Sequence, residues 1–184
     1  MLSRVLNLIA AETQEPPRKF YPRPSSAGPE RCIRALVYHA RDFDAKPFPG
    51  RTLVVFDDGN WHAELIKDWI RKSAFQLHSE EMEIETEVGK GHIDGIITDI
   101  LSVDRLLEIK SINHFGYQRL EKGEYPLDYL TQSALYLRGL KKLLPDITEA
   151  ILFFKNKNTS AYTDFVLRYD YDSDTLTVVE REDS

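Results

Sequence analysis

The sequence has little cysteine, no long apolar run and no surplus of basic residues, and each of these absences excludes a class of protein. The single cysteine, Cys32, rules out an internal disulfide framework and any metal site built from several thiolates. No segment approaches the roughly 20 apolar residues of a membrane span. Arg4 and Asn7 interrupt the first apolar stretch, which predicts a small amphipathic helix and not a signal peptide. We therefore expect a soluble, cytoplasmic protein.

The net charge of −6 argues against a protein that coats nucleic acid nonspecifically, because such proteins usually carry a basic surplus. Any contact with phosphate groups must then come from a local patch, and the best candidate includes Arg31, Arg34 and Arg41. Clustered carboxylates stay compatible with a phosphate substrate, since divalent ions bring positive charge to such a site.

The chain of 184 residues fits one domain with its own core. A short N-terminal helix and an extended, Pro- and Ser-rich lead-in occupy residues 1–28, and the core is expected over 29–180. Helices are expected near 29–41, 51–74, 115–120 and 126–144, and strands near 82–87, 91–99, 105–113, 150–156, 162–170 and 175–180. The first three strands form a meander, so the expected fold class is α/β, with a central mixed β-sheet flanked by helices.

The second and third of these strands, GHIDGIITD and RLLEIKSIN, are predicted to pair as an antiparallel hairpin. If the hairpin is centred near Leu101, Asp94 lies opposite Glu108, because each is seven residues from that centre. Directly opposed side chains have Cβ atoms about 4.5–5.5 Å apart, so the two carboxylates repel unless a cation sits between them. Magnesium and manganese prefer such hard oxygen ligands.

Strand alternation places Lys110 on the same face as Glu108, between apolar neighbours. Charges at the centre of a strand are costly to desolvate unless they are paired or bound to metal. A salt bridge between Lys110 and one of the carboxylates is the simplest structural explanation. Together with Asp94 across the hairpin, the pattern favours a catalytic centre.

GHIDGI followed by LLEIKS resembles the PD-(D/E)xK nuclease superfamily, and within it the RecB-like exonuclease branch. The helical segment GNWHAEL is similar to an upstream motif of that branch in which a histidine completes the metal site, here His62. The segment TQSALY is similar to its Q-x-x-x-Y motif, here Gln132 and Tyr136. Four such pieces in the same order, covering about Ser25 to Arg168, make the resemblance specific and imply a restriction-endonuclease-like core in a single RecB-like nuclease domain.

The resemblance implies metal-assisted hydrolysis of DNA phosphodiester bonds with one or two Mg²⁺ or Mn²⁺ ions. The implied metal ligands are His62, Asp94, Glu108 and the main-chain carbonyl of Ile109. Lys110 would orient the attacking water or stabilise developing negative charge, and Gln132 and Tyr136 would position the DNA strand.

Several of these residues also have ordinary structural interpretations. His62 lies with Ile66 and Ile70 on an apolar helix face, where a histidine is more often part of the core. Gln132 and Tyr136, one helical turn apart, could hydrogen-bond each other.

The resemblance also implies that a serine or arginine near the first core helix holds a terminal phosphate, and the candidates here are Ser25, Ser26, Arg31 and Arg34. Solvated arginines explain the same residues equally well. Some CRISPR-associated relatives carry four cysteines that hold an iron–sulfur cluster, and phage recombination exonucleases are the nearer comparison here. Because Cys32 stands alone, we predict no cluster and a buried structural thiol.

The favoured function is a DNA exonuclease of recombination, repair or phage DNA processing in a bacterial or phage-infected cell. Its expected partners are DNA with a free end and a recombination or replication protein, with no membrane. An endonuclease or junction resolvase on the same core is the first alternative. A nucleic-acid-binding subunit without cleavage, or an unrelated α/β protein whose Glu-x-Lys is a salt bridge, are the others. Digestion polarity, strand preference, preferred metal and oligomeric state are not determined by these motifs.

Overall fold

The computed structural model describes residues 2–12, 20–43 and 46–179. Its helices are α1 (Leu2–Glu12), the 3₁₀ turn η1 (Pro24–Ser26), α2 (Ile33–Ala40), α3 (Gly50–Arg71), α4 (His114–Leu120) and α5 (Leu127–Leu140). Its strands are β1 (Gln76–His78), β2 (Glu83–Thr86), β3 (Gly89–His92), β4 (Gly95–Thr98), β5 (Asp104–Ile112), β6 (Glu149–Asn156), β7 (Tyr162–Asp170) and β8 (Thr175–Val179). None of the helices described is long and apolar enough to cross a membrane.

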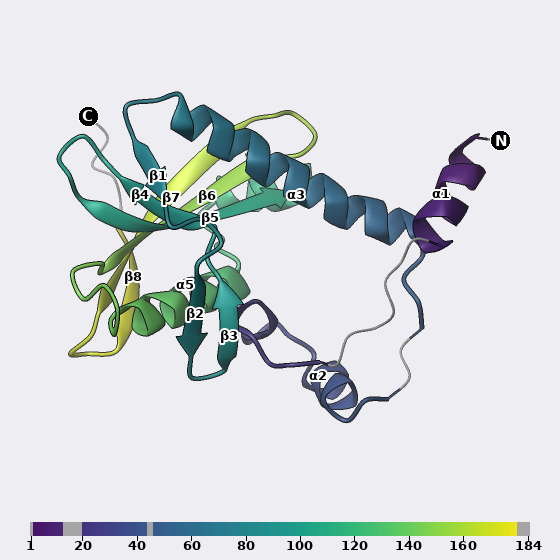
Figure 1. The fold of residues 1–184 in the computed structure, drawn as a ribbon, viewed down its shortest axis with the longest axis horizontal. Coiled ribbons are helices and arrows are strands. Elements are labelled where there is room, and N and C mark those ends of the chain that lie inside the picture. The colour runs from purple at the N-terminus through teal and green to yellow at the C-terminus, as the bar shows by residue number, and fades with distance from the viewer. Residues whose placement is uncertain (1, 13–19, 44–45, 180–184) are drawn as a thin grey trace.

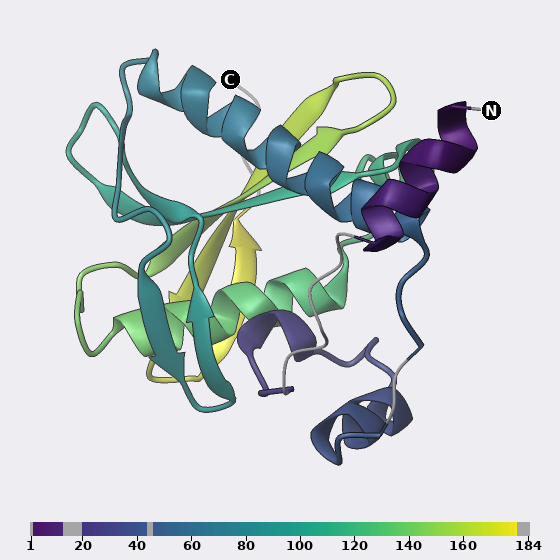
Figure 2. The same cartoon turned by 45° about the vertical axis from the view of Figure 1, so that its right-hand side comes forward.

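A six-stranded sheet in the order β1-β4-β5-β6-β7-β8 forms the centre of the molecule (Figure 1). Strands β5 and β6 run parallel and the other neighbours run antiparallel. Helix α3 covers one face and α5 the other, as both views show (Figures 1 and 2). The prediction of a mixed α/β fold with a central mixed sheet between helices is confirmed.

The two faces of β5 explain this layering. Leu106 belongs to the larger apolar core, which also contains Leu137 of α5, whereas Leu107 and Ile109 belong to a smaller core with Ile66 of α3. Because successive side chains of a strand point to opposite faces, Glu108 and Lys110 share the α5 face with Leu106.

The expected three-strand meander is wrong in two respects. The stretch 91–99 is not one strand, because the chain leaves the ladder at residues 93–94 and divides it into β3 and β4. Strand β2 pairs only with β3, in a separate two-stranded sheet, and the neighbour of β4 in the main sheet is β1. With three residues, β1 is too short to give an alternating pattern.

Other boundaries differ from the sequence-based expectations at chain ends and caps. The helix expected near 29–41 is α2, which begins only at Ile33, with Cys32 at its N-cap. The thiol of Cys32 is free and exposed, which corrects the prediction of a buried structural cysteine. Residues 15–19 of the expected lead-in, and residue 180, lie outside the described residues.

Between Phe20 and Arg31 the chain forms a strap that docks on the start of α5 through Asp128 (Figure 2). The Asp128 carboxylate accepts a hydrogen bond from the Glu30 main-chain N–H at 3.0 Å and pairs with Arg31 at 3.0 Å. Gly28 has a φ of +129° and lies so close to Asp128 that a Cβ there would overlap the carboxylate. The strap is therefore specified by a buried acid and a glycine.

Candidate active site

The hairpin β4–β5 brings Asp94 and Glu108 together as the sequence predicted. Its register pairs Gly95 with Leu107 and Thr98 with Asp104, which centres the hairpin on Leu101 and places Asp94 opposite Glu108, one step beyond the ladder. One oxygen of Asp94, Oδ2, accepts a hydrogen bond from the Ile109 main-chain N–H at 2.6 Å. This bond fixes the carboxylate at the end of β4.

Glu108 is a buried acid that is only partly satisfied. Glu108 is 1% exposed, and Lys110 Nζ donates a hydrogen bond of 2.8 Å to Glu108 Oε2. The other oxygen, Oε1, is buried and has no hydrogen-bond partner among the described residues. Burial raises the pKa of Glu108 to about 7, with Asp94 also acting to raise it, although Lys110 acts to lower it. A buried acceptor without a donor is costly, so Oε1 is suited to a cation.

Lys110 is held between acidic and aromatic groups. Desolvation acts to lower its pKa, but Glu108 and Asp94 outweigh it, so the pKa is raised and the ammonium is charged. Its Nζ also lies over the ring of Tyr129 on α5, 5.6 Å from the centroid. The predicted Glu–Lys salt bridge exists, and it accounts for one of the two Glu108 oxygens only.

The α5 face of the site carries Gln132 and Tyr136, both buried. The Tyr136 hydroxyl donates to the His92 main-chain carbonyl at 2.9 Å, and burial raises its pKa to about 12. Gln132 interacts with the same hydroxyl, while Glu108 and Lys110 act on it electrostatically. The predicted pair therefore lies beside the two charged residues. The His92 side chain itself is exposed.

His62 lies apart from Asp94 and Glu108. It belongs to α3, which covers the sheet face opposite to that of Glu108, and its ring lies 3.6 Å from Asp58. Burial lowers its pKa, and Lys155 and Lys157 lower it further. No contact described here joins His62 to Asp94 or Glu108, so its role as a metal ligand stays a prediction.

The predicted phosphate-binding group is distributed over separate contacts. The Ser26 hydroxyl donates to the Arg23 carbonyl at 2.7 Å and closes η1. Arg31 pairs with Asp128 and donates to the Ser25 carbonyl at 3.0 Å. Arg34 is an exposed residue of α2. Arg31 has a structural task in the strap, and phosphate binding by these residues stays a prediction.

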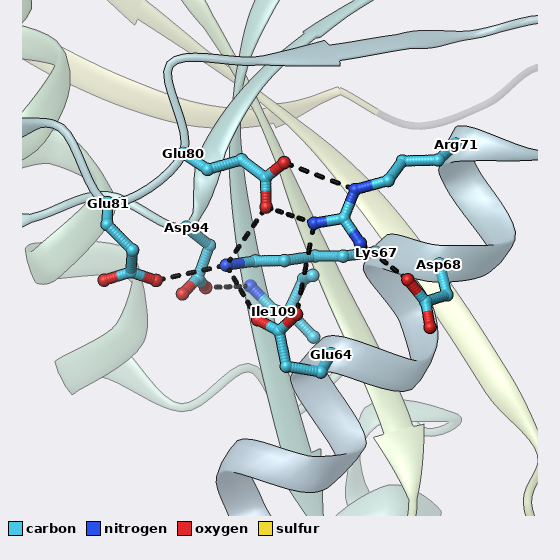
Figure 3. Close-up of polar contacts among 8 residues, drawn as sticks. All are labelled: Glu64, Lys67, Asp68, Arg71, Glu80, Glu81, Asp94 and Ile109. Carbon is cyan, nitrogen blue, oxygen red and sulfur yellow. Dashed lines mark hydrogen bonds and ion pairs between the residues drawn. The ribbon is translucent and has the colours of Figure 1, made fainter.

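A residue that the sequence did not single out lies close to the site. Lys67 of α3 is 2% exposed and points toward Asp94 and the pair Glu80 and Glu81 (Figure 3). A lysine on a long helix gives no sequence signal of burial, because most such lysines are solvated. Only the approach of the segment between β1 and β2 to α3 encloses it.

The donor set fits a hard divalent cation that keeps several waters. Asp94 and Glu108 supply carboxylate oxygens, and the orphaned Glu108 Oε1 has no other described use. Within the part of the chain that the structure describes, no three His, Cys, Asp or Glu side chains already stand at metal-binding geometry. A Mg²⁺ or Mn²⁺ ion would therefore be held by few protein ligands, as Mg²⁺ usually is.

Comparisons with known proteins add little to this geometry. No family model and no curated protein matches the sequence. Among solved structures, the crystal structure of SSO0001 is similar with a TM-score of 0.42 and 16% sequence identity, over 89% of this chain and 77% of that one. So weak a likeness carries no argument about function.

Proposed function

We propose that this chain is a divalent-metal-dependent deoxyribonuclease that hydrolyses DNA phosphodiester bonds, with Asp94, Glu108 and Lys110 at its catalytic centre. The observation that carries the proposal is the buried, unpartnered Oε1 of Glu108 in register with Asp94 and bonded through its other oxygen to Lys110. A salt bridge alone would leave that oxygen unexplained.

Each charged group has a definite task in this reaction. Asp94 Oδ2 is fixed by the Ile109 main-chain N–H, and Glu108 Oε1 is buried without a described donor. Asp94, Glu108 Oε1 and the Ile109 carbonyl would hold the cation. When bound, the ion supplies a water acidic enough to attack near neutral pH and screens the phosphate charge. Glu108 must lose its proton for this, and a pKa of about 7 places that step near neutrality.

Lys110, the partner of Glu108, is proposed to act on the DNA phosphate. Its ammonium is charged and retains Glu108 Oε2 as a partner while Oε1 is used elsewhere. During hydrolysis a water molecule loses a proton to solvent as its oxygen attacks phosphorus. The bond from phosphorus to the leaving sugar oxygen breaks, and that oxygen takes up a proton from solvent. The Lys110 ammonium stabilises the negative charge that grows on the phosphate oxygens.

An exonuclease acting on DNA with a free end is the favoured form of the activity. Its support is the Q-x-x-x-Y pair, because Gln132 and Tyr136 lie buried beside Glu108 and Lys110 and not on an unrelated surface of α5. Recombination, repair or phage DNA processing, with a partner protein of such a pathway, is the matching biological setting. The alternatives are an endonuclease or junction resolvase, and a subunit that binds DNA without cutting it.

The test is cleavage of end-labelled single- and double-stranded DNA with Mn²⁺, Mg²⁺ or EDTA. We compare wild type, Lys110→Ala and the matched control Lys141→Ala, since Lys141 stacks on Tyr171 away from the site. Metal-dependent cleavage that only Lys110→Ala loses is the expected result. Covalently closed circles then separate an exonuclease, which leaves them intact, from an endonuclease. DNA binding without cleavage under any condition would refute the catalytic role.

A further inference from the structure

A second charged cluster adjoins the candidate site and is centred on Lys67 (Figure 3). The Lys67 side chain is 2% exposed, and its Nζ lies 3.1 Å from an oxygen of Glu81. Oxygens of Glu64 and Glu80 lie 3.4 and 3.8 Å from the same nitrogen. A buried ammonium therefore occupies the centre of a group of carboxylates.

Asp94 connects this cluster to the carboxylates of the candidate metal site. It acts electrostatically on Lys67 and on Glu108, and Figure 3 shows its carboxylate bonded to the Ile109 main-chain nitrogen, on the side of the cluster where the Lys67 side chain ends. Glu81, which hydrogen-bonds Lys67, also acts on Glu108. Lys67 of α3 and the expected metal ligands of the β4–β5 hairpin therefore influence one another's charge.

Arg71, the other cation of the cluster, forms ion pairs at the outer side of the cluster. It pairs with Glu80 at 2.5 Å and with Asp68 at 2.6 Å. Lys67 is the cation of this group that acts on Asp94. Without its charge, Glu81 would lose its hydrogen-bonded cation and Asp94 a nearby positive charge. Carboxylates left without a cation are the situation that attracts a divalent ion.

We propose that Lys67 is a positioning residue that fills, as a permanent cation, the place beside Asp94 where a second divalent ion would otherwise bind. It thereby limits the site to one ion. This inference rests on the proposed function, since it assumes that the first ion binds Asp94 and Glu108.

The dimensions of the cluster suit an ammonium and not a metal ion. The Nζ–O distances of 3.1 to 3.8 Å are longer than the roughly 2.0–2.1 Å of Mg²⁺–oxygen bonds. Glu64 and Glu81 have mostly exposed side chains, so they can move inward if the ammonium is removed. Burial by itself lowers the pKa of Lys67, but Glu81 and Asp94 raise it above its ordinary value, so the charge is permanent.

The experiment titrates Mn²⁺ alone, without DNA, into the full chain and counts bound ions by calorimetry and by electron paramagnetic resonance. The proteins are wild type, Lys67→Met, Lys67→Arg and Lys72→Met. Methionine keeps the length of the side chain and removes its charge, and arginine keeps the charge. Lys72, the C-cap residue of α3, is a control whose ammonium lies over the Trp69 ring. We expect one ion in wild type, Lys67→Arg and Lys72→Met, and two magnetically coupled ions in Lys67→Met.

The outcomes separate this inference from the proposed function. One ion in both wild type and Lys67→Met overturns the role of Lys67 and leaves the metal site intact. Two ions in wild type also overturn the role of Lys67 and leave the metal site intact. This result comes from the wild-type protein alone, so it does not depend on whether a variant folds. No ion in wild type contradicts the proposed function. The inference then fails with it, because it assumes a first ion at Asp94 and Glu108.

Discussion

The buried carboxyl of Glu108 should make the stability of the metal-free protein fall as the pH rises. Its pKa is raised from 4.5 to about 7 by burial, and the attraction of Lys110 reduces but does not cancel this effect. A folded-state pKa above the unfolded value means that the folded protein holds the proton more tightly. The stabilising contribution is therefore fully present below pH ~4.5 and is lost as the pH passes through about 7.

The size of this effect follows from the pKa difference. At about 1.36 kcal/mol per pH unit, a rise from 4.5 to about 7 corresponds to about 3 kcal/mol of unfolding free energy. Glu108→Gln retains the shape of the side chain and cannot ionise. The unfolding free energy of Glu108→Gln, relative to wild type, should thus rise by about 3 kcal/mol between pH ~4.5 and pH ~8.

Urea unfolding in EDTA, followed by far-ultraviolet circular dichroism at several pH values, measures this difference. Groups such as Asp99, whose pKa is lowered chiefly by its hydrogen bond from Arg105, titrate in both proteins and cancel. Mn²⁺ at pH ~8 should stabilise wild type far more than Glu108→Gln. A difference between the two proteins that stays constant over the whole pH range would refute the assignment of Glu108 as a desolvated, partly unsatisfied acid.

Four further substitutions test packing around the site. Gly28→Ala introduces a Cβ against Asp128 at a positive φ, so the strap should detach at a cost of roughly 2 kcal/mol, seen as faster limited proteolysis of residues 20–31. Tyr136→Phe removes a hydrogen bond of 2.9 Å to a main-chain carbonyl and should lower the unfolding free energy by about 1 kcal/mol in urea titrations. Trp69→Ala, at a residue 64% exposed, should cost under about 1 kcal/mol, whereas Ile66→Ala, at a residue 7% exposed, should cost about 2–5 kcal/mol by the same measurement. Equal costs at Trp69 and Ile66 would contradict the observed orientation of α3.

The sequence by itself determined the hairpin and the residues it brings together. Alternation within RLLEIKSIN specified which side chains share a face, and the symmetric spacing about Leu101 specified the register that pairs Asp94 with Glu108. Both properties are local, because a strand has a period of two and a short hairpin has few possible registers. The Q-x-x-x-Y pair was equally accessible, since residues four apart share one helical face.

Tertiary structure decided which helical faces are buried and where each charge lies. Trp61, Leu65 and Trp69 form as regular an apolar row on α3 as Ile66 and Ile70 do, yet the three lie exposed, because the sheet packs against the other side. Periodicity identifies rows on a helix but does not say which row meets a partner.

The same limit applies to the candidate site. His62 and Lys67 project from different flanks of one helix, toward β6 and toward Asp94 respectively, and their spacing alone does not choose between them. Burial of Lys67 depends on Glu80 and Glu81 arriving from the segment before β2. The charge state of Glu108 likewise depends on how completely the surrounding layers exclude water, which is a property of the packed fold and not of any motif.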